Sequence, residues 1–147
     1  MIRSLLTCAA LAFAAPAAAQ AVLYDCTVNQ TSGLDGWVST RLALVVDAQG
    51  AAQVVDSLTL QYYDGAVPAR VRNRNGELRF NWSISNATDV RSSRIPTVSY
   101  FAWFTPETGA VRVRAKPAGY PQSMRGQGKC TTRENMNVRQ LNRLLRG

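Results

Sequence analysis

The sequence contains no histidine and only three cysteines among its 147 residues. The missing histidine excludes a histidine-based catalytic triad, a histidine-rich zinc site and a haem ligated by histidine. Charged residues make up only 18% and apolar residues 46%, a composition too apolar for a disordered chain. After the first twenty residues, no apolar run approaches the roughly 20 residues that a membrane-spanning helix requires. These absences leave a small globular protein of one domain.

The first nineteen residues have the pattern of a secretory signal peptide. One positive charge at Arg3 precedes an apolar stretch, a break at Pro16 and three alanines that end at Ala19. We expect cleavage after Ala19, so that residues 1–19 are the leader and residues 20–147 form a single mature domain. The alanine-rich and arginine-rich composition favours a Gram-negative bacterium, and therefore a periplasmic or secreted protein.

Removing the leader also removes Cys8 and leaves Cys26 and Cys130. An even number of cysteines in an exported chain predicts a disulfide bond. This bond would join the first strand to the last and close a loop that the chain-entropy model values at up to about 4.7 kcal/mol. A reactive thiol pair or a metal clip is the alternative, but the spacing is not Cys-x-x-Cys and no further soft ligand accompanies the pair. The sequence therefore predicts no metal and no cofactor.

Apolar and polar residues alternate with period two through most of the mature chain, and turn residues recur about every ten residues. This pattern is typical of antiparallel strands. Asn75-Gly76 is a clear hairpin turn, because this dipeptide tolerates the positive φ angles of tight turns. The pattern predicts eight strands, at about residues 22–29, 37–46, 53–62, 69–74, 77–85, 97–105, 111–116 and 126–132.

Eight antiparallel strands leave two sheet edges, which a first-to-last disulfide would bring together. The predicted fold is therefore all-β, a small antiparallel eight-stranded barrel. A two-sheet sandwich has the same strand pattern and stays the alternative. A short C-terminal amphipathic helix is predicted over residues 135–146, with an apolar stripe of Val138, Leu141 and Leu145. This helix would pack on the barrel or make a peripheral contact with a membrane.

Charge is divided unevenly along the mature chain. Residues 20–69 carry five acids and one arginine, whereas residues 70–147 carry fifteen basic residues and four acids. On two predicted strands the basic residues alternate, so that each set projects from one sheet face. Such a row is tolerable on a solvated face, where it would serve solubility, or opposite an anion. The candidate anion-binding residues are Arg70, Arg72 and Arg74 on one strand and Arg112, Arg114 and Lys116 on another.

Aromatic residues accompany these charges on the predicted strand 97–105, which contains Tyr100, Phe101, Trp103 and Phe104. We expect most of these rings in the core. Basic and aromatic residues interleaved on strands are also typical of proteins that bind single-stranded nucleic acid. An exported protein seldom meets that ligand, so no nucleic-acid partner is expected.

The segment 116–128 is rich in proline and glycine and is predicted as a long recognition loop, pinned by the cysteine that follows it. Tyr120 and Arg125 are its candidate contact residues. The alternative is an ordinary loop with Tyr120 packed beneath it. A second candidate loop is the segment 86–96, in which two arginines flank a pair of serines.

The residues with catalytic potential do not form a recognisable arrangement. Glu77, Glu107 and Glu134 lie on separate elements, and the two lysines of the mature chain lack a Ser-x-x-Lys spacing. We therefore expect no enzymatic activity. The sequence favours a monomeric exported binding module whose basic surface binds an anionic lipid, an anionic glycan or an acidic protein. A carrier of a small apolar ligand is an alternative, although inward aromatic side chains would fill a barrel of eight strands.

The order of elements resembles that of the periplasmic inhibitors of c-type lysozyme. Tyr24-Asp25-Cys26 follows the leader, a β-rich body comes next, and a distal cysteine ends it. The resemblance implies an eight-stranded barrel that presents a serine and a lysine to the lysozyme cleft, for which Ser123 and Lys129 are the nearest matches. Lysozymes of that type are strongly basic and would repel a basic chain on approach. Enzyme inhibition is therefore an alternative function.

Overall fold

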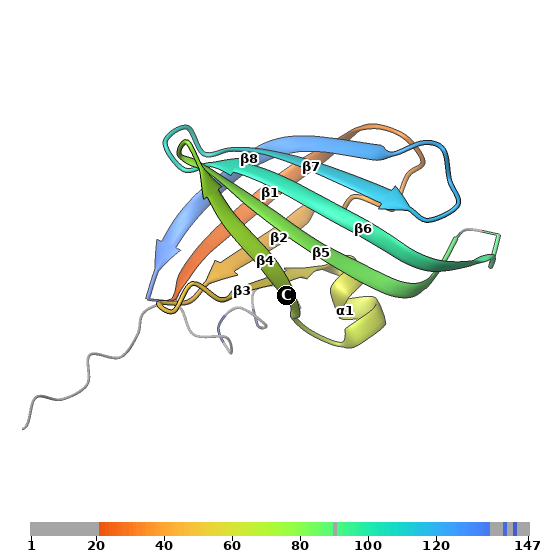
Figure 1. Cartoon of the computed structure of the whole chain (residues 1–147), viewed down its shortest axis with the longest axis horizontal. Coiled ribbons are helices and arrows are strands. Elements are labelled where there is room, and N and C mark those ends of the chain that lie inside the picture. Colours follow the sequence, from red (N-terminus) through yellow and green to blue (C-terminus); the bar gives the residue numbers. More distant parts are fainter. Residues whose placement is uncertain (1–20, 90, 136–139, 141–142, 144–147) are drawn as a thin grey trace, which may run out of the picture.

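Eight strands form one closed antiparallel barrel, in which each strand pairs with the next and the last pairs back with the first (Figure 1). The computed structural model describes residues 21–89, 91–135, 140 and 143. The predicted eight-stranded barrel is confirmed, and the strands do not separate into the two sheets of a sandwich. The strands are β1 (Val22–Ser32), β2 (Arg41–Val46), β3 (Ala52–Asp56), β4 (Val67–Arg74), β5 (Glu77–Thr88), β6 (Arg94–Thr105), β7 (Ala110–Pro117) and β8 (Met124–Glu134).

The barrel closes where β1 pairs with β8. Cys26 lies directly opposite Cys130 in this ladder, and the two form the predicted disulfide bond, which spans 104 residues of sequence. The strands approach closely because β8 carries glycine at two positions. A Cβ atom at Gly128 would overlap the carbonyl oxygen of Thr27, and one at Gly126 would lie 2.8 Å from the side chains of Val28 in β1 and of Val38. Both glycines therefore belong to a strand at a close backbone approach, as the predicted strand 126–132 has them, and not to the predicted loop 116–128 that also included them.

Side chains from alternate strand positions fill the barrel interior. In β5, Phe80, Trp82 and Ile84 are buried, whereas Asn81 and Ser83 face outward, as the period-two pattern predicts. Each fully buried large apolar side chain contributes about 1.5–3 kcal/mol to folding. The same alternation therefore builds the core on one side of each strand and leaves the other side of β4–β7 for polar residues.

A second apolar cluster lies on the outer side of the first three strands. Leu23, Ala43, Val45 and Val55 are buried there, and Leu60 packs against them. These residues alternate with the ones that face the interior. The wall made by β1–β3 is thus apolar on both faces, unlike the wall made by β4–β7.

The predicted third strand, residues 53–62, is wrong in its second half. It ends at Asp56, and a short helix, α1 (Ser57–Tyr63), follows. The Asp56 carboxylate accepts a hydrogen bond from the Thr59 backbone N–H at 2.7 Å, and the Thr59 hydroxyl accepts one from the Asp56 N–H at 2.9 Å. This reciprocal pair is a capping box, which fixes a helix start. It overrides the apolar alternation that indicated a continuing strand.

Among the described residues, the structure defines one helix, α1, and this helix is internal and not C-terminal. The predicted C-terminal helix over residues 135–146, with its apolar stripe, falls largely outside the described residues, as does the predicted leader over residues 1–19. Within the described part of the chain, no helix has both the length and the apolar character needed to cross a bilayer.

A polar group of side chains lies inside the barrel at the end that α1 covers. Asp56, Trp82 and Tyr100 border a cavity of about 10 Å³, which is space for about one water molecule. The indole N–H of Trp82 and the hydroxyl of Tyr100 are buried there without a hydrogen-bond partner. Burial, followed by the nearby negative charge of Asp56, raises the pKa of Tyr100, so that its hydroxyl stays protonated.

Removing the disulfide should destabilise the barrel without changing its strand order. We expect the double variant Cys26→Ser/Cys130→Ser to lose about 2–4 kcal/mol of unfolding free energy, because its unfolded chain is no longer constrained. Urea unfolding of the variant, beside wild type with and without a reductant, measures this loss. Equal stability of oxidised and reduced wild type would show that the bond does not constrain the unfolded state.

Asp56 should make stability depend on pH. Burial raises its pKa, against the opposing hydrogen bonds from Thr59, Ser39 and Leu58, so the folded state binds the proton more tightly than the unfolded state does. Its contribution is therefore present at acid pH, below the ordinary carboxyl pKa, and is lost as pH rises through the raised value. We expect Asp56→Asn, which keeps the helix cap, to be at least as stable as wild type at pH 7 and to flatten this pH dependence.

The matched variant is Asp56→Ala, which removes the cap and should cost about 0.5–2 kcal/mol at either pH. Denaturant titrations at pH 4 and pH 7 separate the two effects. If Asp56→Asn were as unstable as Asp56→Ala at pH 7, the ionised carboxylate itself would be stabilising.

Candidate anion-binding site

The outer faces of β4, β5 and β6 bring basic and aromatic side chains side by side. The Asn75-Gly76 turn joins β4 to β5, with positive φ angles at both residues, as predicted for this hairpin. The Asn73 side chain accepts a hydrogen bond from the Gly76 N–H and fixes the turn further. This register places Arg72 opposite Arg79, and the next ladder places Arg79 opposite Trp103.

A second row of partners runs beside the first. Arg70 pairs with Asn81, and Asn81 pairs with Phe101. Residues directly opposite each other in a sheet lie on the same face, so both rows project outward from the barrel. Phe101 and Trp103 are half-buried and their rings lie 6.1 Å apart between centroids, with an angle of 21°.

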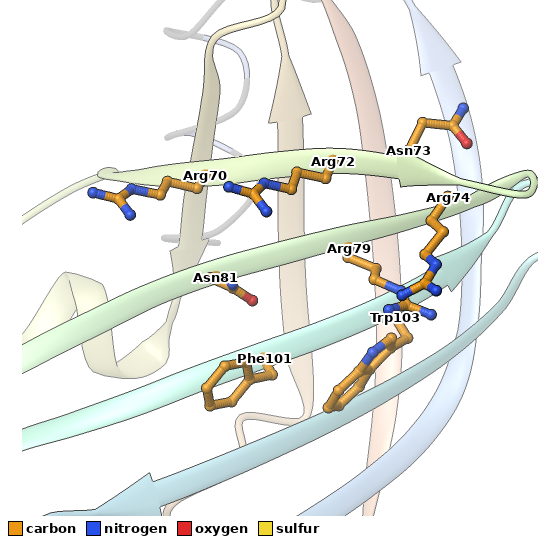
Figure 2. Close-up of a pocket in the computed structure, with 8 residues that line it drawn as sticks. All are labelled: Arg70, Arg72, Asn73, Arg74, Arg79, Asn81, Phe101 and Trp103. Carbon is orange, nitrogen blue, oxygen red and sulfur yellow. The ribbon is translucent and has the colours of Figure 1, made fainter.

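These rows form a shallow pocket of about 480 Å³ on the barrel wall. Figure 2 shows that its lining comes from three adjacent strands, with Arg74 and Arg79 pointing toward one another near the hairpin end. Four of its residues are arginines, and none is acidic. The pocket is lined by Arg70, Arg72, Asn73, Arg74, Arg79, Asn81, Phe101 and Trp103.

One carboxylate lies beside the pocket and holds two of the nearby guanidinium groups. Glu77 accepts a hydrogen bond from Arg79 at 2.9 Å and another from Arg112 at 3.0 Å. Arg112 also lies over the ring of Trp103, 5.6 Å from its centroid. Within the described residues, Arg70, Arg72 and Arg74 form no ion pair. The positive charge of the pocket is therefore only partly neutralised.

The structure separates the predicted basic residues into groups. Arg70, Arg72 and Arg74 come together in the pocket, and Arg112 joins its border through Glu77 and Trp103. Arg114 and Lys116 continue along β7 on the same outer wall but do not line the pocket. Arg114 pairs with Phe101 on one side and with Arg125 on the other, and Lys116 pairs with Ser99.

The predicted recognition loop over residues 116–128 is shorter than expected. β7 extends to Pro117 and β8 begins at Met124, so the connection is residues 118–123 and Arg125 belongs to a strand. Tyr120 is half-buried, packs against the core, and donates a hydrogen bond to Asp89 at 2.8 Å. This geometry agrees with the alternative of an ordinary loop with Tyr120 packed beneath it.

The structure also changes the location of the other candidate residues that the sequence placed in loops. The predicted loop over residues 86–96 shortens to residues 89–93, because β5 and β6 extend into it, and Arg91 and Arg94 are exposed there, away from the pocket. Ser123 is half-buried just before β8. Lys129 lies within β8, opposite Thr27 and Ala110, and not in a loop as the lysozyme-inhibitor resemblance implied.

Five pocket residues escaped the sequence prediction: Asn73 on β4, the polar pair Arg79 and Asn81, and the aromatic pair Phe101 and Trp103. The polar pair lies on the solvated face of β5, and only the register with β4 distinguishes these two residues from other polar residues on that face. The aromatic pair was not recognised because β6 carries rings on both faces: Tyr100 and Phe104 fill the core, whereas Phe101 and Trp103 face outward. The signal that could have located them is the Asn-Gly hairpin, because it fixes which residues of β5 face the arginines of β4.

A wider groove of about 850 Å³ adjoins the pocket and shares Arg70, Asn81 and Phe101 with it. It lies where β4 changes partners. Val67, Pro68 and Ala69 pair with β3, and pairing with β5 begins only at Arg70.

The side of β5 that faces this groove is bounded by α1. The Tyr63 hydroxyl accepts a hydrogen bond from the Ser85 N–H at 2.8 Å, and the Tyr62 hydroxyl accepts one from the Thr88 N–H at 3.1 Å. The helix therefore provides side-chain partners at positions where a strand partner is missing.

The described residues contain no group of three cysteine, aspartate or glutamate side chains that could hold a metal ion. Comparison with known proteins finds no family model, no curated protein and no solved structure that matches this chain. Its function is therefore inferred from the geometry of the barrel wall.

The contact between Tyr120 and Asp89 should be visible by titration. This hydrogen bond, followed by one from the Ser93 N–H, lowers the pKa of Asp89. We expect Tyr120→Phe to raise the pKa of Asp89 toward its ordinary value, measured by NMR titration of the carboxyl carbon. Since the folded pKa is depressed, the stabilising contribution is present at neutral pH and lost as pH falls through the folded value.

The control is Tyr63→Phe, which removes a tyrosine hydroxyl that does not contact Asp89 and should leave the titration of Asp89 unchanged. An unaltered Asp89 pKa in Tyr120→Phe would mean that the two loops are not joined in solution.

Proposed function

We propose that the protein is a non-catalytic binding module that holds an anionic envelope component or an acidic protein on the outer face of β4–β6. The observation that carries this proposal is the pocket in which Arg70, Arg72 and Arg74 lie beside two aromatic rings and form no ion pair within the described residues. Like charges at neighbouring positions repel each other, and an anionic ligand would relieve that repulsion.

The residue types support recognition and not solubility alone. A guanidinium group presents a planar fork of donors that matches carboxylate and phosphate oxygens in pairs. Phe101 and Trp103 add flat apolar surface on an outer wall, where solubility alone would favour polar side chains. Glu77 holds Arg79 and Arg112 in place at the border, so part of the cationic surface is already ordered before a ligand binds.

The proposal includes export, because the predicted leader would direct the chain to the periplasm or the medium, and action as a monomer. The alternatives gain less from the geometry. The interior cavity beside Asp56 is about 10 Å³, too small for an apolar ligand. Lys129 lies in a strand, and this does not favour the loop-presented pair of a lysozyme inhibitor.

Charge reversal in the pocket should abolish polyanion binding. We expect Arg72→Glu/Arg74→Glu to lower affinity for inorganic polyphosphate at least tenfold at low salt, because both substitutions place negative charge in the pocket. Wild-type affinity should fall as salt rises, since the screening length shortens from about 30 Å at 0.01 M to about 8 Å at 0.15 M. Isothermal titration calorimetry over this salt range measures both effects.

The control is Arg94→Glu, which reverses one charge where the pocket variant reverses two, at an exposed position about 30 Å along β6 from Trp103. It should change affinity less than about twofold. Salt-independent binding, or an equal loss in Arg94→Glu, would contradict an electrostatic site in this pocket.

A further inference from the structure

The cationic pocket is one end of a longer groove with a different chemistry at its other end. The pocket and the wider groove share Arg70, Asn81 and Phe101, so they are continuous along the barrel wall. One end presents four guanidinium groups and an indole. The other end approaches Tyr63 of α1, and among the described residues that line it the shared arginine is the one charged residue.

The two walls of the uncharged end differ in polarity. One wall is apolar and contains Pro68 and Ala69, whereas the other carries serine hydroxyls on the outer faces of β5 and β6. Ser83 lies directly opposite Ser99 in the ladder, and both are on the outward face. A ligand that fits here has an apolar face and a hydrogen-bonding edge.

The floor of this end is formed by two aromatic core residues. Trp82 and Tyr100 line the groove and stack with 5.2 Å between ring centroids. The Trp82 side-chain N–H and the Tyr100 hydroxyl are buried and have no hydrogen-bond partner. Both donors border the interior cavity beside Asp56, which has space for about one water molecule that can pair with them, so the floor offers the groove an aromatic surface.

The groove also follows a gap in the strand pairing. β4 leaves β5 beyond Arg70, and α1 supplies tyrosine hydroxyls to Ser85 and Thr88 farther along β5. Among the described residues, the stretch of β5 from residue 82 to residue 84 has no strand partner on this side. Backbone groups, serine hydroxyls and the Asn81 amide therefore lie along one line, beside the aromatic pair.

We propose that the groove binds an acidic oligosaccharide, with carboxylate groups at the arginine end and the hydroxyl edges of further sugar rings along the serines. This inference rests on the proposed function and names its ligand class. Sugar rings have apolar faces and hydroxyl edges, which match the rings of Phe101 and Trp103 and the serine wall. A lipid acyl chain would leave the serine hydroxyls and the Asn81 amide that line the groove unpaired, at a cost in free energy.

The test compares two anions, of which one has hydroxylated sugar rings and the other has none. Hexagalacturonate carries carboxylates on hydroxylated rings, whereas inorganic polyphosphate of equal charge carries no rings. We expect hexagalacturonate to bind at least tenfold more tightly at the same ionic strength, measured by calorimetry. Ser83→Ala/Ser99→Ala should lower affinity for hexagalacturonate at least fivefold and leave affinity for polyphosphate unchanged.

The matched control is Ser83→Thr/Ser99→Thr, which keeps both hydroxyls on strand-compatible side chains and should bind hexagalacturonate within about twofold of wild type. Thermal unfolding of each variant confirms that the barrel is intact. Arg72→Glu/Arg74→Glu should weaken both ligands, because the arginine end is common to them.

The outcomes separate the two proposals. Equal affinities for both anions, with no effect of the serine substitutions, would overturn the oligosaccharide inference and leave the anion-binding function standing. Tighter binding of oligothymidylate or of phosphatidylglycerol vesicles than of hexagalacturonate would also overturn it, in favour of a nucleic acid or a membrane surface. No binding of any of these anions would remove both proposals.

Discussion

Closure of the barrel between β1 and β8 is the constraint on which the remaining structure depends. Strands from opposite ends of the chain meet there, and such long-range pairing carries a high entropy cost before its contacts form. Two features offset this cost. The Cys26–Cys130 bond limits the unfolded chain, and the glycines of β8 let the two backbones approach. Because β1 pairs with β8, the described strands leave no unpaired edge at the two ends of the sheet, and the outward side chains of β4–β7 are held on one continuous wall.

The candidate site follows from this architecture through the alternation of side chains. Strands β4–β7 send apolar residues inward and arginine, asparagine, serine and aromatic residues outward. The ladders between β4, β5 and β6 fix the spacing of the pocket residues near the hairpin, so a ligand bound there need not order a flexible loop. The single carboxylate of Glu77 limits the repulsion between Arg79 and Arg112 without neutralising the pocket.

Much of the fold could be predicted from the sequence because its local signals are independent of distant contacts. Period-two alternation identified the strands, and Asn75-Gly76 identified a hairpin. The helix α1 was missed because Leu58 and Leu60 continue the alternation of β3, while the deciding contact, Asp56 with Thr59, is a pair of side-chain hydrogen bonds. The glycines of β8 also fitted a loop, because the contact that requires glycine there, with the backbone of β1, is made by residues far away in the sequence.

Part of the candidate site could be predicted because it too follows from local alternation along one strand. Alternation alone placed Arg70, Arg72 and Arg74 on one face, but which residues stand beside them depends on the register of two further ladders. Register across several strands cannot be read locally, so Trp103 and Arg79 entered only with the structure.

The change of partner along β4 has a consequence for how the barrel moves. A wall that is held by tyrosine hydroxyls and not by a continuous ladder has fewer backbone bonds to break, and it lies apart from the covalent link between Cys26 and Cys130. Local fluctuations concentrate where backbone pairing is sparse. We therefore expect this segment to open before the rest of the barrel, while the disulfide-linked pair of β1 and β8 stays closed.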